Sequence, residues 1–114
     1  MLRALVIVPL VAGTLAVGKP AQADPYYTTT PPEGCYLYEY VHQGFLFGVR
    51  TYCTRMHGLH RAVVRCSDGN LIYGYTEEMD YNLMSLAECR ERPYDWSSRP
   101  IPAVEAWGEY WPDY

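Results

Sequence analysis

Lysine is almost absent from this chain of 114 residues: Lys19 is the only one, and it lies near the N-terminus. Residues 24–114 therefore offer no side-chain amine for covalent catalysis, which excludes Schiff-base chemistry there. The same stretch has seven basic residues, all of them arginine, against 13 acidic ones, so its formal charge is −6. Because nucleic-acid-binding surfaces need basic patches, we expect no nucleic-acid partner.

Catalytic motifs are missing as well. The few serines do not include one in a Gly-x-Ser-x-Gly nucleophile elbow. The carboxylates of Glu77, Glu78 and Asp80 are more typical of a helix N-terminus than of a glycosidase pair. A chain this small has little room for a concave active site, so we do not expect an enzyme.

Long apolar runs are limited to one, from Ala4 to Val17. It follows the positive start around Arg3 and precedes the small-x-small stretch 21–23, which is the pattern of a secretory signal peptide over residues 1–23. The run is shorter than the about 20 residues of a membrane span. We therefore expect a secreted or extracytoplasmic product with no membrane span after signal cleavage.

The chain has four cysteines, an even number that is typical of an exported protein with disulfides. A mature chain of residues 24–114 is one small domain, for which disulfides commonly supplement the core. Four cysteines in such a chain indicate two disulfides. We favour Cys35–Cys53 with Cys66–Cys89, each closing a loop of about 20 residues worth roughly 3 kcal/mol. The rival pairing, Cys35–Cys66 with Cys53–Cys89, stays open.

The stretch from Cys35 to Cys53 predicts a β-hairpin. Its two halves alternate, and the turn that joins them is centred on Gly44. Matching like faces sets the register, since a slip of one residue would invert one strand. The cross-strand pairs expected are Cys35 with Cys53, Tyr36 with Tyr52, and Tyr38 with Arg50.

The next segments predict further strands and one helix. Residues 61–66 and 71–75 flank an Asp-Gly turn at 68–69, a strong hairpin signal. Apolar residues in the stretch 77–91 recur at helical spacing, with acidic residues at its start and Pro93 after its end. The expected fold is α+β: a small disulfide-linked antiparallel meander of three to four strands, with one helix packed on its cysteine face.

The two flanks of this domain, residues 35–92, have a different composition. Residues 24–34 carry three prolines and three threonines, which predicts an extended lead-in. Residues 93–114 form an acidic segment rich in proline and aromatic residues, which we expect to be a tail.

The segment 55–61 holds the best candidates for chemistry, namely Arg55, His57, His60 and Arg61. Two histidines are a weak metal site once the cysteines are bridged, so we expect no metal and no cofactor. This segment supports the alternative function, a small secreted hydrolase or a protein resembling a protease inhibitor.

The tyrosines are the most informative feature. The register places four of them on one sheet face with Arg50, and tyrosine is enriched in recognition surfaces. Either the tail tryptophans fold back over this face, or the face and tail are exposed and bind an extracellular protein or a glycan. The leading hypothesis is a non-enzymatic binding protein. The candidate binding residues are Tyr36, Tyr38, Tyr40, Arg50, Tyr52, Trp107 and Trp111.

Overall fold

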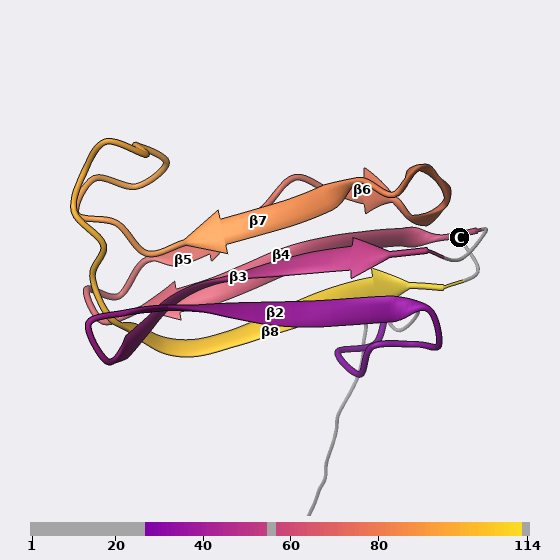
Figure 1. Cartoon of the computed structure of the whole chain (residues 1–114), viewed down its shortest axis with the longest axis horizontal. Helices are drawn as coiled ribbons and strands as arrows, with labels where there is room; N and C mark the ends of the chain where they lie inside the picture. Colours follow the sequence, from indigo (N-terminus) through magenta and orange to yellow (C-terminus); the bar gives the residue numbers. More distant parts are fainter. Residues whose placement is uncertain (1–26, 55–56, 113–114) are drawn as a thin grey trace, which may run out of the picture.

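The computed structural model describes residues 27–54 and 57–112. The predicted signal peptide and Arg55 lie outside these ranges. The described residues form two antiparallel sheets, stacked one behind the other in Figure 1. The first sheet has the order β2-β3-β7, and the second is built around β4. These strands are β2 (Cys35–His42), β3 (Phe45–Cys53), β7 (Met84–Glu88) and β4 (Leu59–Cys66).

The second sheet uses both edges of β4. One edge pairs with β8 (Ala103–Trp111), and the other pairs with the short strands β5 (Leu71–Tyr73) and β6 (Glu77–Glu78). β3 and β4 are thus neighbours in sequence but central strands of different sheets. The single meander predicted from the sequence is wrong, because β3 and β4 lie in different sheets.

The predicted hairpin is confirmed. β2 and β3 pair in the expected register, with Cys35 opposite Cys53 and Tyr38 opposite Arg50. Gln43 and Gly44 form the turn, and both have positive φ, at 49° and 86°. This conformation suits the right-handed twist of a two-residue hairpin.

Both favoured disulfides are confirmed, Cys35–Cys53 and Cys66–Cys89. The first lies within one sheet and joins β2 to β3. The second joins the two sheets, because Cys66 ends β4 while the amide of Cys89 donates to the Phe47 carbonyl of β3. One cross-link therefore closes a hairpin and the other closes the sandwich.

The predicted helix over residues 77–91 is wrong. A 3₁₀ turn over Met79–Tyr81 ends at Asn82, which adopts a left-handed φ of 55°, and the chain continues as β7. The residues that β7 buries are small, Ser85 and Ala87, whereas Met84 is 53% exposed. The helical spacing combined Leu83, which is 44% exposed, with the buried Met79 and Cys89, so the tertiary environment outweighed the periodicity.

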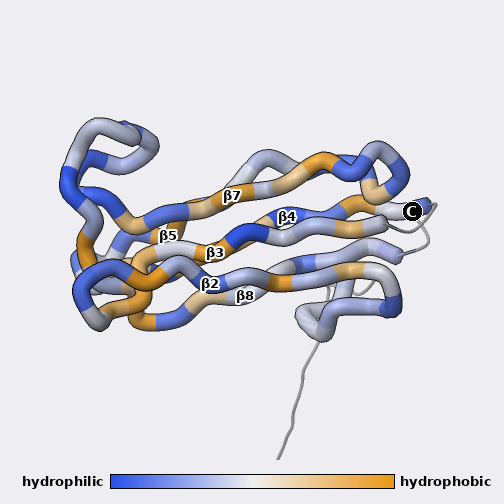
Figure 2. The backbone as a smooth tube through the Cα atoms, in the orientation of Figure 1, coloured by the Kyte–Doolittle hydropathy of each residue, from blue (hydrophilic) through white to orange (hydrophobic). Residues whose placement is uncertain are grey.

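The predicted tail also needs correction. Residues 103–111 form β8, which is paired with β4 from Ala103 to Trp111. On the other side of β8, the backbone of Thr28 exchanges two hydrogen bonds with Tyr110, of 2.8 and 2.9 Å. The remaining loop between β7 and β8 extends beyond the sheets and is mostly hydrophilic (Figures 1 and 2).

The core between the sheets is a thin layer of small side chains. Its main cluster comprises Val49, Ala62, Val64, Cys66, Ile72, Ala87 and Cys89. A second cluster joins the Cys35–Cys53 disulfide to Met79 and Tyr110. Gly108 is needed beside it, because a Cβ there would overlap the ring of Tyr110 and the methyl group of Thr51.

Replacing Met79 with alanine tests this second cluster. Met79 is fully buried and its sulfur lies 3.8 Å from that of Cys35. Its truncation leaves a cavity, so we expect a loss of about 2–5 kcal/mol in the free energy of unfolding. Urea denaturation of the oxidised chain measures this, with Met84→Ala as the matched control expected to change stability by only about 0.5 kcal/mol. Equal losses for the two variants would contradict the packing described.

Candidate binding face

The outer face of the first sheet carries the residues that the hairpin register predicted. Five of them make up what we call the tyrosine face: Tyr36, Tyr38, Tyr40, Arg50 and Tyr52. Antiparallel partners share a face, so the pairs Tyr36–Tyr52 and Tyr38–Arg50 lie side by side. Tyr36 and Tyr38 are 48% and 46% exposed. The face points away from the second sheet, toward the reader in Figure 1.

Arg50 is at the centre of this face. Its guanidinium carbon lies 4.7 Å from the ring centroid of Tyr38, and its Nη1 lies 3.2 Å from the sulfur of Met84 on β7. Its Nε is shielded from solvent and has no hydrogen-bond partner. The guanidinium therefore rests on an aromatic ring and a thioether, both of which are weak acceptors for a cation.

Trp107 and Trp111 lie elsewhere. They belong to β8 and therefore to the second sheet, so the structure does not bring them to the tyrosine face. The interpretation in which the tail folds over the tyrosines is wrong for these two residues. Trp96 is in the loop after β7 and is 66% exposed. The predicted binding residues thus separate into two groups, on two sheets.

The second group forms what we call the arginine–aromatic ladder, on the outer face of the second sheet. The guanidinium of Arg61 lies over the rings of Tyr73 and Trp111, at 4.2 and 5.5 Å. It also pairs with Glu109 at 2.7 Å, and the indole N–H of Trp107 donates to the same carboxylate at 3.1 Å. The members of this ladder are Arg61, Arg65, Tyr73, Glu105, Trp107, Glu109 and Trp111.

The ladder satisfies its own charges. Arg65 extends it over Trp107 at 5.9 Å and pairs with Glu105 at 3.4 Å. Val63 is fully buried although it lies on this outer face, between its cross-strand neighbours Tyr73 and Trp107. We therefore regard the ladder as a structural cover of the second sheet rather than as a free surface.

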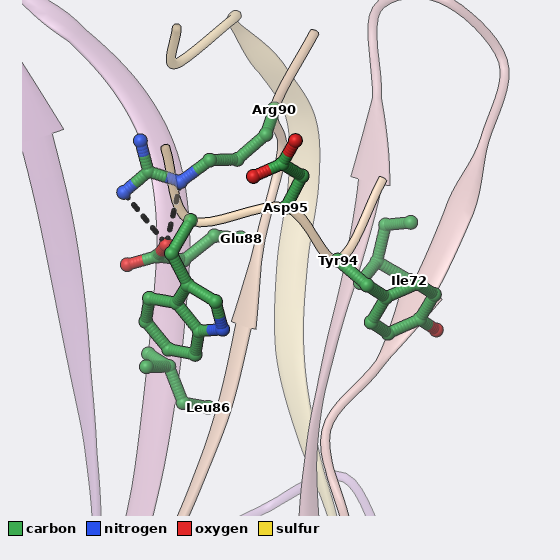
Figure 3. A pocket seen from close by; sticks show the side chains of 7 residues that line it. Ile72, Leu86, Glu88, Arg90, Tyr94 and Asp95 are labelled. Atoms are coloured by element: carbon green, nitrogen blue, oxygen red, sulfur yellow. Dashed lines mark hydrogen bonds and ion pairs between the residues drawn. The ribbon is translucent and has the colours of Figure 1, made fainter. Parts of the chain in front are cut away.

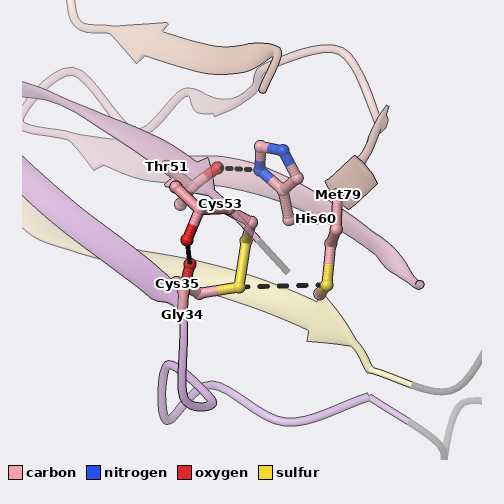
Figure 4. Close-up of a disulfide and its surroundings, with 7 residues drawn as sticks. Gly34, Cys35, Thr51, Cys53, His60 and Met79 are labelled. Carbon is pink, nitrogen blue, oxygen red and sulfur yellow. Dashed lines mark hydrogen bonds between the residues drawn. A yellow bond between two sulfur atoms is a disulfide. The ribbon is translucent and has the colours of Figure 1, made fainter. Parts of the chain in front are cut away.

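The histidine segment does not assemble into a site. His60 is fully buried between the sheets, where its Nδ1 and the hydroxyl of Thr51 share a hydrogen bond of 2.7 Å (Figure 4). The side chain of His57 is exposed to solvent, and Arg61 pairs with Glu109 in the arginine–aromatic ladder. Within the described ranges, no cluster of three or more histidine, cysteine or acidic residues could hold a metal ion. The hydrolase hypothesis gains no support from this geometry.

Burial changes the acid–base behaviour of two core groups. Desolvation lowers the pKa of the His60 imidazole below its usual value, and the nearby backbone of Leu83 opposes this in part. Burial also raises the pKa of the Tyr110 phenol to about 12. Both shifts favour the neutral form, as expected for groups between two sheets.

A pocket beside β7 was not predicted from the sequence. It is lined by Leu86, Glu88 and Arg90, with Ile72 of β5 and residues 94–96 of the following loop (Figure 3). The loop is shaped by Asp95: hydrogen bonds from Ser97 and then Arg92 lower the pKa of its carboxyl to about 2. The spacing of Asp95 and Ser97 in the sequence is a turn signal from which this loop could have been predicted.

Tyr94 closes an edge of the second sheet. Its hydroxyl accepts a hydrogen bond from the amide of Tyr73 at 3.3 Å and donates to the carbonyl of Tyr73 at 3.4 Å. A side chain thus occupies the backbone groups of β5 that another strand would use.

The chain matches no known family model, no curated protein and no solved structure. Of the described helices, none has the length and apolar character needed to cross a membrane. The function must therefore be argued from the faces described above.

The buried imidazole makes stability depend on pH. Because the folded-state pKa of His60 is below that of the unfolded chain, its contribution is present above the unfolded value of 6.5 and is lost as the pH falls through the folded value. We expect the melting-temperature advantage of the natural chain over His60→Gln to shrink from pH 7.5 to pH 5, as measured by circular dichroism. His57→Gln is the control and should parallel the natural chain. An advantage that is constant with pH would contradict a buried neutral His60.

Proposed function

We propose that this chain is a small exported, non-enzymatic binding protein that contacts an extracellular protein through its tyrosine face. Export is supported by the signal-peptide pattern of residues 1–23 and by two disulfides, which persist in oxidising compartments. The observation that carries the proposal is the contiguous set of half-exposed tyrosines around Arg50 on a rigid, disulfide-linked hairpin.

The composition of the face supports a protein partner rather than a glycan. Tyrosine, arginine and methionine are enriched in the buried centres of protein interfaces, and tyrosine and arginine dominate their energetics. Arg50 on β3 contacts both Tyr38 on β2 and Met84 on β7, so the three side chains span the three strands of the first sheet. Such a rigid aromatic surface loses little side-chain entropy on binding.

The hairpin geometry supports preorganisation. The Cys35–Cys53 disulfide lies at one end of β2 and β3, and the tight turn at Gln43–Gly44 lies at the other. Tyr36 and Tyr38 are between these two fixed ends, and β7 continues the same face beyond β3. The backbone that carries the tyrosine face is therefore held by the disulfide at one end, by the turn at the other end, and by pairing with β7 along one edge.

A double substitution on the tyrosine face tests the proposal. The exported chain, or its Tyr36→Ser/Tyr38→Ser variant, is immobilised and exposed to culture supernatant of the source organism. We expect proteins retained by the natural chain to be lost from the variant, because the variant removes two half-exposed rings without touching the core. Quantitative mass spectrometry of the retained proteins is the measurement.

The matched control replaces two other exposed tyrosines, Tyr75 and Tyr81, which are 85% and 65% exposed outside the face. The Tyr75→Ser/Tyr81→Ser variant should retain the same proteins as the natural chain. Circular dichroism should show that both double variants keep the natural melting temperature. Retention that is identical in all three chains would rule out the tyrosine face as the binding surface.

A further inference from the structure

We propose that Arg50 makes the tyrosine face a recognition site for a carboxylate, supplied by an Asp or Glu side chain of the partner protein. This inference rests on the proposed function and gives the partner a chemical character. It follows from how the arginines of the described chain are paired, from what surrounds Arg50, and from the kind of surface in which Arg50 is set.

Arg50 differs from the other arginines within residues 27–54 and 57–112. Each of the other five forms an ion pair with a carboxylate, at distances from 2.7 to 3.4 Å. These pairs are Arg61–Glu109, Arg65–Glu105, Arg90–Glu88, Arg92–Asp95 and Arg99–Glu91. Arg50 alone among them has no carboxylate partner, although the sequence from residue 24 onward is acidic overall.

The strand register explains why Arg50 is unpaired. Its direct neighbours across the sheet are Tyr38 on β2 and Leu86 on β7, neither of which carries a charge. The one acid on β7 is Glu88, which faces the same side one pleat away. Its Oε1 already accepts from Nε and Nη2 of Arg90, at 2.9 and 2.8 Å (Figure 3). The carboxylate of Glu88 is therefore already paired with Arg90 and does not neutralise Arg50.

Arg50 is also partly desolvated. Its Nε has no contact with solvent and no hydrogen-bond partner, and the guanidinium is covered on one side by Tyr38. Water solvates a cation in this position only poorly. The electrostatic attraction between this cation and an incoming anion is therefore stronger than for a fully solvated arginine. An arginine guanidinium can bind the two oxygens of a carboxylate in a planar, bidentate arrangement.

The surface around Arg50 favours an acidic segment of a protein over other anions. Tyr36 and Tyr38 supply apolar area with hydroxyls, and Met84 borders the charge on the side of β7. A protein segment can place apolar side chains on these groups while an acidic side chain reaches Arg50. The absence of any second unpaired described cation nearby argues against a polyanion, which needs several.

A selection from a random dodecapeptide phage library tests the inference. The exported, oxidised chain is the bait, and the variant of interest is Arg50→Met, which keeps the unbranched apolar stem but removes the charge. We expect selected peptides to share an Asp or Glu, and to bind Arg50→Met at least about tenfold more weakly, as for loss of a charged hydrogen bond. Isothermal titration calorimetry with synthetic peptides measures the affinities.

Two controls separate charge recognition from general weakening. Changing the shared Asp or Glu of the peptide to Asn or Gln should cost the same factor against the natural chain and nothing further against Arg50→Met. Arg65→Met, which removes a half-exposed arginine of the second sheet, should bind the peptides as the natural chain does. Arg50→Lys should recover part of the affinity because it restores the charge without the planar fork.

Three other results would overturn the inference in distinguishable ways. If the selected peptides lack an acidic residue but bind the Tyr36→Ser/Tyr38→Ser variant more weakly than the natural chain, the proposed function stands and carboxylate recognition is overturned. If the peptides bind the Tyr36→Ser/Tyr38→Ser variant and the natural chain with equal affinity, both the proposed function and carboxylate recognition are overturned. On a parallel glycan array, binding of uronate-bearing oligosaccharides that depends on Arg50, with no peptide selected, would overturn the protein partner.

Discussion

The close approach of two small sheets is the constraint on which the rest of this molecule depends. The sheets meet through small residues such as Ala62, Ser85, Ala87 and Gly108, so their backbones lie close together. The hydroxyl of Ser85 accepts a hydrogen bond from the amide of Ala62 at 2.9 Å, directly from one sheet to the other. So thin a layer buries modest apolar area, and the Cys66–Cys89 disulfide joins its two sides covalently.

This thin core displaces the large side chains to the outer faces. Most of the aromatic rings that the sequence displays so prominently lie outside the sandwich, whereas Tyr110 is fully buried. The two outer faces differ in whether their charged side chains are paired. On the second sheet, arginines, glutamates and rings form a ladder that pairs every one of its charges. On the first sheet, the rings surround an arginine that no carboxylate reaches. That contrast, within one small fold, is the basis for our proposal that the first sheet carries the binding surface.

The local predictions succeeded where the determining forces act over short distances. The β2–β3 hairpin follows from alternation, a two-residue turn and the pairing of like faces, so its register and the Cys35–Cys53 disulfide were predictable. The tyrosines and Arg50 were placed on a common face by the same argument. The segment from β6 to β7 was predicted wrongly because its buried residues are Ser85 and Ala87, which a hydrophobicity pattern does not single out.

The sequence by itself determined the hairpin, the position of Cys35 opposite Cys53 and the common face of the tyrosines, because each depends on spacing along a short stretch of chain. Only the tertiary structure decided that β3 and β4 belong to different sheets, that residues 103–111 pair with β4, and that Trp107 and Trp111 face away from the tyrosines. It also decided that Arg50 stays unpaired while the other described arginines find carboxylates. Those outcomes depend on contacts between segments that are distant along the chain, and such contacts leave no periodic trace in the sequence.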